Sequence, residues 1–198
     1  MEFHVITNGK QPFSKARCIL QQIEPFIDYI HIREKHLDQH TIETWIEHLK
    51  QVNFPLSKVI LNTHAEIAAT YSLGGVHLPE RIENLSAIKK HFPKLTVGAS
   101  IHSLSSARAK QQADYFMFGH IFETASKENM TPRGVQALHQ LCSATTKPII
   151  AIGGISIKNL HQVKASGASG FAMMNGIMEH PEPQKIAKQI HTMIKGWS

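Results

Sequence analysis

The chain has 198 residues, of which 42% are hydrophobic and 18% charged, a composition typical of a globular protein with a sizeable buried core. The formal net charge of +6 is scattered along the chain, and no basic stretch carries interleaved aromatic residues, so a nucleic-acid partner is not expected. No apolar run approaches the ~20 residues of a membrane helix, and the N-terminus lacks the pattern of a signal peptide. We therefore expect no membrane partner and a cytoplasmic location.

The two cysteines, Cys18 and Cys142, fall in segments of helical pattern and have no metal-ligand spacing. Their context predicts reduced, mostly buried thiols without a disulfide.

Short β-branched or aromatic runs alternate along the chain with longer segments of helical period. The predicted strands are Phe3–Thr7, Tyr29–Arg33, Lys58–Leu61, Gly75–Leu78, Thr96–Ala99, Asp114–Gly119, Pro148–Gly153 and Gly170–Met174. The predicted helices are Ser14–Gln22, Asp38–Gln51, Ala65–Tyr71, Leu85–His91, Ser103–Lys110, Gly134–Cys142, Ile157–Ser166 and Pro183–Lys195.

Strict alternation of strands and helices predicts a parallel sheet covered by helices. Eight such units predict closure into one compact (β/α)₈ barrel, a single domain of residues 1–198. A doubly wound open sheet is the alternative, and the absence of a GxGxxG fingerprint after any strand counts against it. The longest polar connection, Glu123–Arg133, is a candidate lid.

In such a barrel, binding and catalytic residues lie at the carboxyl ends of the strands. Gly153 and Gly154 follow the seventh strand, and Asn175 and Gly176 follow the eighth, where barrels often bind phosphate. Glycines let the backbone approach an anion, and a short helix at Asn175–Met178 would point its first amides toward it. A tight turn without a ligand is the alternative, and the pairing of the two strand ends favours phosphate.

The second strand carries a polar face. Alternation puts Tyr29, His31 and Arg33 on one side and the isoleucines on the other, which predicts that Arg33 points toward the barrel mouth. An arginine there can bind a carboxylate or phosphate, although a loop arginine paired with Glu34 is an open alternative.

Of the chain's 14 histidines, His120 stands where the sixth strand ends. An imidazole exchanges protons near neutral pH, so this position makes His120 the candidate acid/base.

Several strings are similar, over essentially the whole chain, to motifs of the thiamin phosphate synthase/TenI superfamily, whose members are (β/α)₈ barrels of about this size. The strings run from Tyr29 to Lys35, from Gly75 to Pro79, from Gly98 to Ser103, from Phe118 to Thr124, from Pro132 to Val135 and from Ala151 to Ile155.

Within this superfamily two activities compete. The synthase couples a pyrimidine diphosphate to a thiazole phosphate and needs Mg²⁺, which aspartates hold. This chain has Thr63 and Ile82 near the aspartate positions, His31 in place of a glutamine, and His120 where a proline is usual. The departures match the TenI type, so the resemblance implies a thiazole tautomerase, an isomerase that needs no metal and no cofactor.

On this reading a phosphorylated thiazole is the partner, His120 carries the proton, and the amides of Gly154, Asn175 and Gly176 hold the phosphate. Matching the family's motifs adds Ser100, Thr124, Lys127 and Met174 to the substrate site, with Arg33 for the carboxylate. Thiamin phosphate synthase and a non-catalytic sensor of thiamin phosphates are the alternatives. The oligomeric state stays open, a homodimer included.

Overall fold

The computed structural model describes residues 1–82 and 84–197. Its eight parallel strands form a closed barrel in the order β1 to β8, and β8 pairs with β1 to complete the ring. The strands are β1 (Glu2–Ile6), β2 (Tyr29–Ile32), β3 (Val59–Asn62), β4 (Gly75–Leu78), β5 (Val97–Ile101), β6 (Tyr115–Gly119), β7 (Ile149–Ile152) and β8 (Gly170–Met173). The predicted (β/α)₈ barrel is therefore confirmed, and the open-sheet alternative is wrong.

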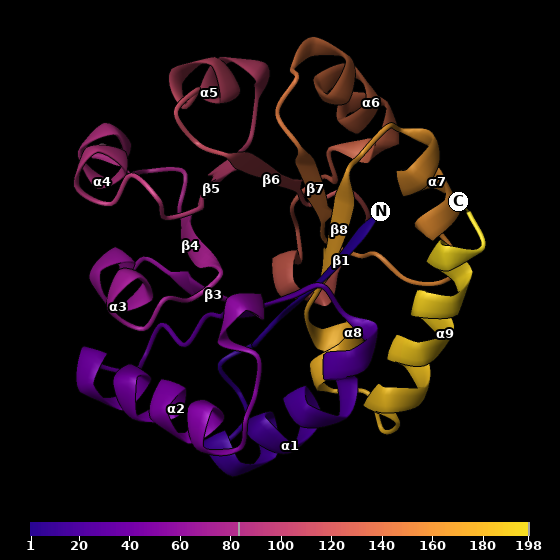
Figure 1. The fold of residues 1–198 in the computed structure, drawn as a ribbon. Coiled ribbons are helices and arrows are strands. Elements are labelled where there is room, and N and C mark those ends of the chain that lie inside the picture. The colour runs from indigo at the N-terminus through magenta and orange to yellow at the C-terminus, as the bar shows by residue number, and fades with distance from the viewer. Residues whose placement is uncertain (83, 198) are drawn as a thin grey trace.

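Helices surround the strands, with the N-terminus in the middle of the ring and the C-terminus at its edge (Figure 1). The α-helices are α1 (Phe13–Ile23), α2 (Gln39–Gln51), α3 (Ala65–Thr70), α4 (Leu85–His91), α5 (Leu104–Ala109), α6 (Gly134–Ala144), α7 (Leu160–Ala165), α8 (Asn175–Met178) and α9 (Pro183–Lys195). The 3₁₀ turns are η1 (Glu24–Phe26), η2 (Leu56–Lys58) and η3 (Ala125–Lys127). The predicted domain also includes Glu83 and Ser198, which lie outside the described residues. That residues 1–198 form a single domain stays a prediction.

Element bounds differ from the predictions by a few residues. The largest difference is at α7, which begins at Leu160 instead of Ile157. The Asn159 side chain accepts a hydrogen bond from the Ser156 amide at 2.8 Å and donates one to the Gly154 carbonyl at 2.8 Å. These bonds hold the preceding residues in a loop that belongs to the end of β7.

The barrel has two apolar regions with a sheet between them. Ile30 and Ile32 belong to the large cluster between the sheet and the helices, as alternation on β2 predicts. A smaller cluster fills the barrel interior, where Tyr29 packs. The interior residues are Ile6, Ile60, Tyr115, Met117, Ile150 and Ala172.

The barrel interior is also polar, because three buried histidines share it. His4, His31 and His77 are at most 3% exposed, and their rings lie in a chain with centroids 5.2 and 5.6 Å apart. This polar interior reaches from the amino-terminal end of the barrel to the strand ends.

The structure shows the state of the two cysteines, which were predicted to be reduced and mostly buried. Both cysteines are free as predicted, but Cys18 is exposed on α1, so its predicted burial is wrong.

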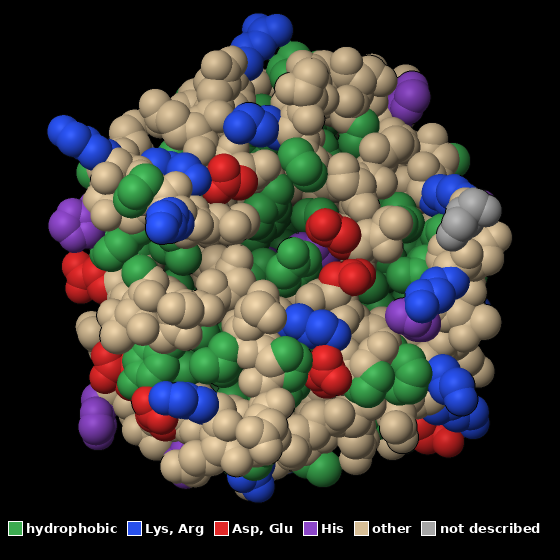
Figure 2. Space-filling view, in the orientation of Figure 1, with side chains coloured by type: hydrophobic (Ala, Val, Ile, Leu, Met, Phe, Trp, Pro, Cys, Tyr) green, Lys and Arg blue, Asp and Glu red, His purple; other side chains and the backbone are tan. Residues whose placement is uncertain are grey.

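Basic side chains are interspersed with acidic and apolar ones on the face seen in Figure 2. Among the described residues, no helix has the length and apolar character needed to cross a membrane.

Gly98 on β5 leaves room for the ring of Tyr115. A Cβ at this position would lie 2.0 Å from Tyr115 Cζ, and the ring is buried and bonded to His77 at 3.2 Å. We expect Gly98→Ala to lower the free energy of unfolding by about 1–3 kcal/mol, as overpacking of a core does. Gly196→Ala, whose nearest neighbour would be 3.6 Å away, is the control. Equal urea midpoints for the two variants would contradict this account of the interior.

Candidate active site

A cavity of about 870 Å³ opens at the carboxyl ends of the strands. All eight strands, or the residues that directly follow them, contribute to its wall. All ten predicted site residues line it: Arg33, Ser100, His120, Thr124, Lys127, Gly153, Gly154, Met174, Asn175 and Gly176. The structure therefore brings the predicted residues together, while their individual roles stay predictions.

One end of the cavity is built from glycine-bearing backbone after β7. Gly153 and Gly154 have φ of +100° and +66°, a region that favours glycine. A Cβ on Gly153 would lie 2.2 Å from His120 Cβ, and one on Gly154 would lie 2.3 Å from the Glu123 carbonyl oxygen. The bare backbone at this end thus packs closely under the connection after β6.

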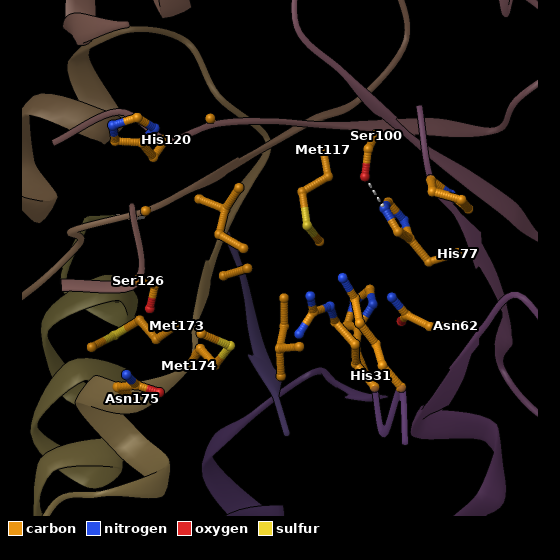
Figure 3. A pocket seen from close by; sticks show the side chains of 18 of the residues that line it. His31, Asn62, His77, Ser100, Met117, His120, Ser126, Met173, Met174 and Asn175 are labelled. Carbon is orange, nitrogen blue, oxygen red and sulfur yellow. Dashed lines mark hydrogen bonds between the residues drawn. The ribbon is translucent and has the colours of Figure 1, made fainter. Parts of the chain in front are cut away.

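The same end is bordered by α8, which begins at the predicted Asn175. The Asn175 side chain accepts a hydrogen bond from Asn8 Nδ2 at 3.2 Å, which ties the loop after β1 to α8. Ser126 and Lys127 line the cavity from the connection after β6, and Figure 3 shows Ser126 on the same side as Asn175.

That connection, the predicted lid Glu123–Arg133, is hydrogen-bonded to the ends of β5 and β6. Arg133 donates from Nε to the Gly119 carbonyl at 2.8 Å and from Nη1 to the His102 carbonyl at 2.7 Å. His120, 5% exposed, has Nε2 at 3.1 Å from the Met130 carbonyl. Because a carbonyl only accepts, this contact places the proton of a neutral His120 on Nε2.

The opposite end of the cavity is rich in polar side chains from β2 to β5. Figure 3 shows His31, Asn62, His77 and Ser100 on one side and His120, Ser126 and Asn175 on the other, with Met117 between them. Arg33 and Lys35 add two cations to this polar end. Burial lowers the pKa of the Arg33 guanidinium, and the neighbouring Glu34 carboxylate opposes that shift.

Four buried polar atoms of the cavity wall lack a hydrogen-bond partner within residues 1–82 and 84–197. They are His31 Nδ1, Glu34 Oε2, Asn62 Oδ1 and His102 Nδ1. Native proteins satisfy nearly all buried polar groups, so these four atoms are open to hydrogen bonds from a ligand or from ordered water.

Sequence reasoning assigned no binding role to His31, Glu34, Asn62 or His77. Alternation on β2 had placed His31 inside the barrel, and Asn62 was visible as a polar residue at the end of β3. The Ser100–His77 hydrogen bond of 2.9 Å joins side chains 23 residues apart and depends on the barrel's register. Burial, with His4 adding to it, lowers the pKa of His77 to about 3, so the ring is neutral near pH 7.

The positions near which the resemblance implies aspartates for Mg²⁺ hold no carboxylate in this chain. Among the described residues no group of three or more His, Cys, Asp or Glu side chains could hold a metal ion. Glu34 and Glu80 are the acidic side chains of the cavity wall. Thr63, near an expected aspartate position, instead directs its hydroxyl to the Asn62 carbonyl, and Ile82 packs on the outer core.

Residues 3–177 match the family model described as "Thiamine monophosphate synthase". The thiamine-phosphate synthase of Chlorobium phaeobacteroides is 29% identical over 98% of this chain and 97% of its own. That of Chlorobium phaeovibrioides is 36% identical over 66% of this chain and 65% of its own. These matches confirm the superfamily resemblance of the motifs.

Solved structures match the fold. A thiamine phosphate pyrophosphorylase from Pyrococcus furiosus superposes with a TM-score of 0.81 at 22% identity, over 98% of this chain and 96% of that one. A 3-hexulose-6-phosphate synthase from Salmonella typhimurium does so with a TM-score of 0.79 at 12% identity, over 99% of both chains.

The comparisons overturn the predicted activity. Four local departures from the synthase motifs predicted a thiazole tautomerase, an isomerase; they lie at His31, Thr63, Ile82 and His120. The curated relatives named above are synthases, and one of them is similar along 98% of the chain. The tautomerase and isomerase predictions are therefore wrong, because they gave four side chains more weight than the similarity of the rest.

Arg133 fixes the connection after β6 to the strands below. We expect Arg133→Met to lower the free energy of unfolding by about 1.5–3 kcal/mol, because the Gly119 and His102 carbonyls lose a charged hydrogen-bond donor. Faster amide hydrogen exchange between Glu123 and Arg133 should accompany the loss. Arg108→Met, on the exposed side of α5, is the matched control. Unchanged exchange in the Arg133 variant would show that other contacts hold this connection.

Proposed function

Because the chain belongs to the thiamine monophosphate synthase family, we propose that it is a transferase that joins a pyrimidine diphosphate to a thiazole phosphate. The product is thiamin phosphate, and diphosphate is released. The relatives' names support the reaction type, and the cavity supports two phosphorylated substrates.

The observation that carries this proposal is the division of one cavity into two unlike polar ends. The glycine backbone after β7, α8 and Lys127 form an end suited to the thiazole phosphate, where close backbone approach and a cation favour a phosphate group. Arg33, Lys35 and the unpartnered atoms of β2 to β5 form the other, suited to the pyrimidine diphosphate. A volume of about 870 Å³ lies at the upper part of the ~300–1,000 Å³ range of ligand pockets.

In the transfer step the thiazole ring nitrogen gives its electron pair to the carbon that carries the diphosphate. The bond from that carbon to the diphosphate oxygen breaks, and the leaving group keeps the electrons. Negative charge therefore grows on the departing oxygen. Arg33 and Lys35 are the cations at that end, and positioned cations that meet developing charge lower the barrier.

The family implies a magnesium ion for this leaving group, but this chain has Thr63 and Ile82 near the two aspartate positions, and Glu34 and Glu80 are the carboxylates of the cavity wall. We propose that Arg33 and Lys35 stabilise the negative charge of the departing diphosphate here, without a metal or another cofactor. Ser100, Thr124, Met174 and His120 are proposed substrate contacts from the cavity wall, with His120 on the side of the thiazole phosphate. Residues 1–198 as one cytoplasmic domain, and a homodimer, remain predictions.

A condensation assay tests the function. Pyrimidine diphosphate and thiazole phosphate should yield thiamin phosphate and one equivalent of diphosphate, at equal rates in EDTA and in Mg²⁺. Chromatography measures the product. Thiamin phosphate formed only with Mg²⁺ would contradict the metal-free account. No product under either condition, with both substrates bound, would leave a binding protein and contradict the transferase.

Gly154 tests the phosphate end. Gly154→Ala strains a backbone at φ +66° and crowds the Glu123 carbonyl, and Gly154→Asp adds a negative charge. We expect binding of thiazole phosphate, measured by calorimetry, to weaken by about tenfold in the alanine variant and by about 100-fold or more in the aspartate variant. Gly167→Asp is the control, because its φ is +85° and its Cβ would meet Cys142 at 3.6 Å, at the other end of the barrel. Equal affinities in the Gly154 and Gly167 variants would place the phosphate elsewhere.

A further inference from the structure

A hydrogen-bonded chain runs through the barrel interior from its amino-terminal end to the cavity. Glu2, at the start of β1, has Oε2 at 3.1 Å from His4 Nε2. His4 Nδ1 lies 2.9 Å from His31 Nε2. His31 lines the cavity, and its Nδ1 has no partner among the described residues. We name Glu2, His4 and His31 the histidine relay.

The carboxylate gives this relay a direction. The hydrogen bond from His4 lowers the pKa of Glu2, so its side chain is ionised near neutral pH and only accepts. A neutral His4 must then carry its proton on Nε2, which leaves Nδ1 as an acceptor. His31 in turn must donate from Nε2. The remaining nitrogen, His31 Nδ1, holds a lone pair.

His31 is neutral under these conditions. The ring is 0% exposed, and burial, with His4 and His77 adding to it, lowers its pKa well below the usual value. His31 lines the polar end of the cavity, where Figure 3 shows it beside Asn62 and His77, and its Nδ1 is buried there. Asn62 Oδ1, an acceptor too, is also unpartnered there. His31 Nδ1 and Asn62 Oδ1 are therefore unused acceptors on neighbouring strands of the cavity wall.

We propose that Glu2 and His4 are positioning residues, which hold His31 in the tautomer whose Nδ1 accepts a hydrogen bond from an N–H donor on the bound ring. Glu2 contacts no ligand in this arrangement, since the barrel interior separates it from the cavity. The ligand's identity rests on the proposed function: the pyrimidine of the diphosphate substrate is then one that bears an amino group. The tautomer itself does not depend on that assignment.

Substituting Glu2 by a pure donor should reverse the relay. In Glu2→Lys the ammonium donates to His4 Nε2, so His4 donates from Nδ1 and His31 becomes protonated on Nδ1. The Glu2 side chain is 48% exposed, which leaves room for the lysine. Glu2→Ala removes the carboxylate and should populate both tautomers. Glu66→Lys, an equal charge change on the exposed side of α3, is the control.

Nitrogen-15 NMR of the ring nitrogens reads the tautomer directly. The spectra are taken at pH 8, above the ordinary imidazole range, because a proton on His4 would also make both of its nitrogens donors. The titratable groups that face His4 are Glu2 on its own strand, Tyr29 and His31 on β2, His77 on β4 and Tyr115 on β6.

We expect His31 Nδ1 to resonate as an unprotonated nitrogen in the wild type and the Glu66 variant, and as a protonated one in Glu2→Lys. A protonated Nδ1 in the wild type would overturn the proposal, and so would a tautomer unmoved in both Glu2 variants. If a variant does not fold, the wild-type spectrum alone still shows whether His31 Nδ1 is protonated.

Binding provides the second readout, with a pyrimidine diphosphate that bears an amino group and its analogue with methoxy in that place. The wild type should prefer the amino compound by about tenfold, and Glu2→Lys should lose that preference, while thiazole phosphate affinity stays constant. Equal preference in both proteins would overturn the ligand contact. If neither pyrimidine binds, the proposed function and the ligand contact fail together, whereas the spectra still decide the tautomer.

Discussion

Pairing of β8 with β1 is the constraint on which the rest of the structure depends. Four residue pairs, from Glu2 with Gly170 to Val5 with Met173, close the sheet and fix the strands parallel. Closure places every strand's carboxyl end on one rim, so residues as distant in sequence as Asn8 and Asn175 come within hydrogen-bond distance. Because the barrel is narrow, its interior holds side chains, and in this chain several of them are histidines. Fold, cavity and relay follow from this closure.

The cavity has a physical division that fits the proposed reaction of two substrates. Its β7–β8 end is built around the close-packed backbone of Gly153 and Gly154, whereas its β2–β5 end includes buried polar atoms that lack a hydrogen-bond partner among the described residues. A single small phosphate ligand would leave the second end unsatisfied, so two substrates account for the wall better than one. Arg33 and Lys35 at the second end are the protein charges that the proposal assigns to a leaving diphosphate.

Much of this arrangement could be predicted from the sequence, because the relevant signals are local. Short β-branched runs mark the strands, alternation puts His31 inside and Ile30 outside, and paired glycines mark the end of β7. The rest depends on tertiary contacts. The late start of α7 follows from the Asn159 side chain, and the unpartnered state of Asn62 Oδ1 follows from packing that no sequence pattern encodes. The activity was mispredicted for a related reason: single departures such as His120 carry meaning only in the context of the whole wall.

Simultaneous occupancy of the two ends tests the central claim most directly. Thiazole phosphate and a pyrimidine diphosphate analogue, with carbon in place of the oxygen that leaves, can be titrated by calorimetry singly and together. The account predicts that each compound binds with a stoichiometry of one. After saturation with either compound, the other should still bind with a stoichiometry of one. Mutually exclusive binding, in which each compound displaces the other, would contradict a cavity built for two substrates.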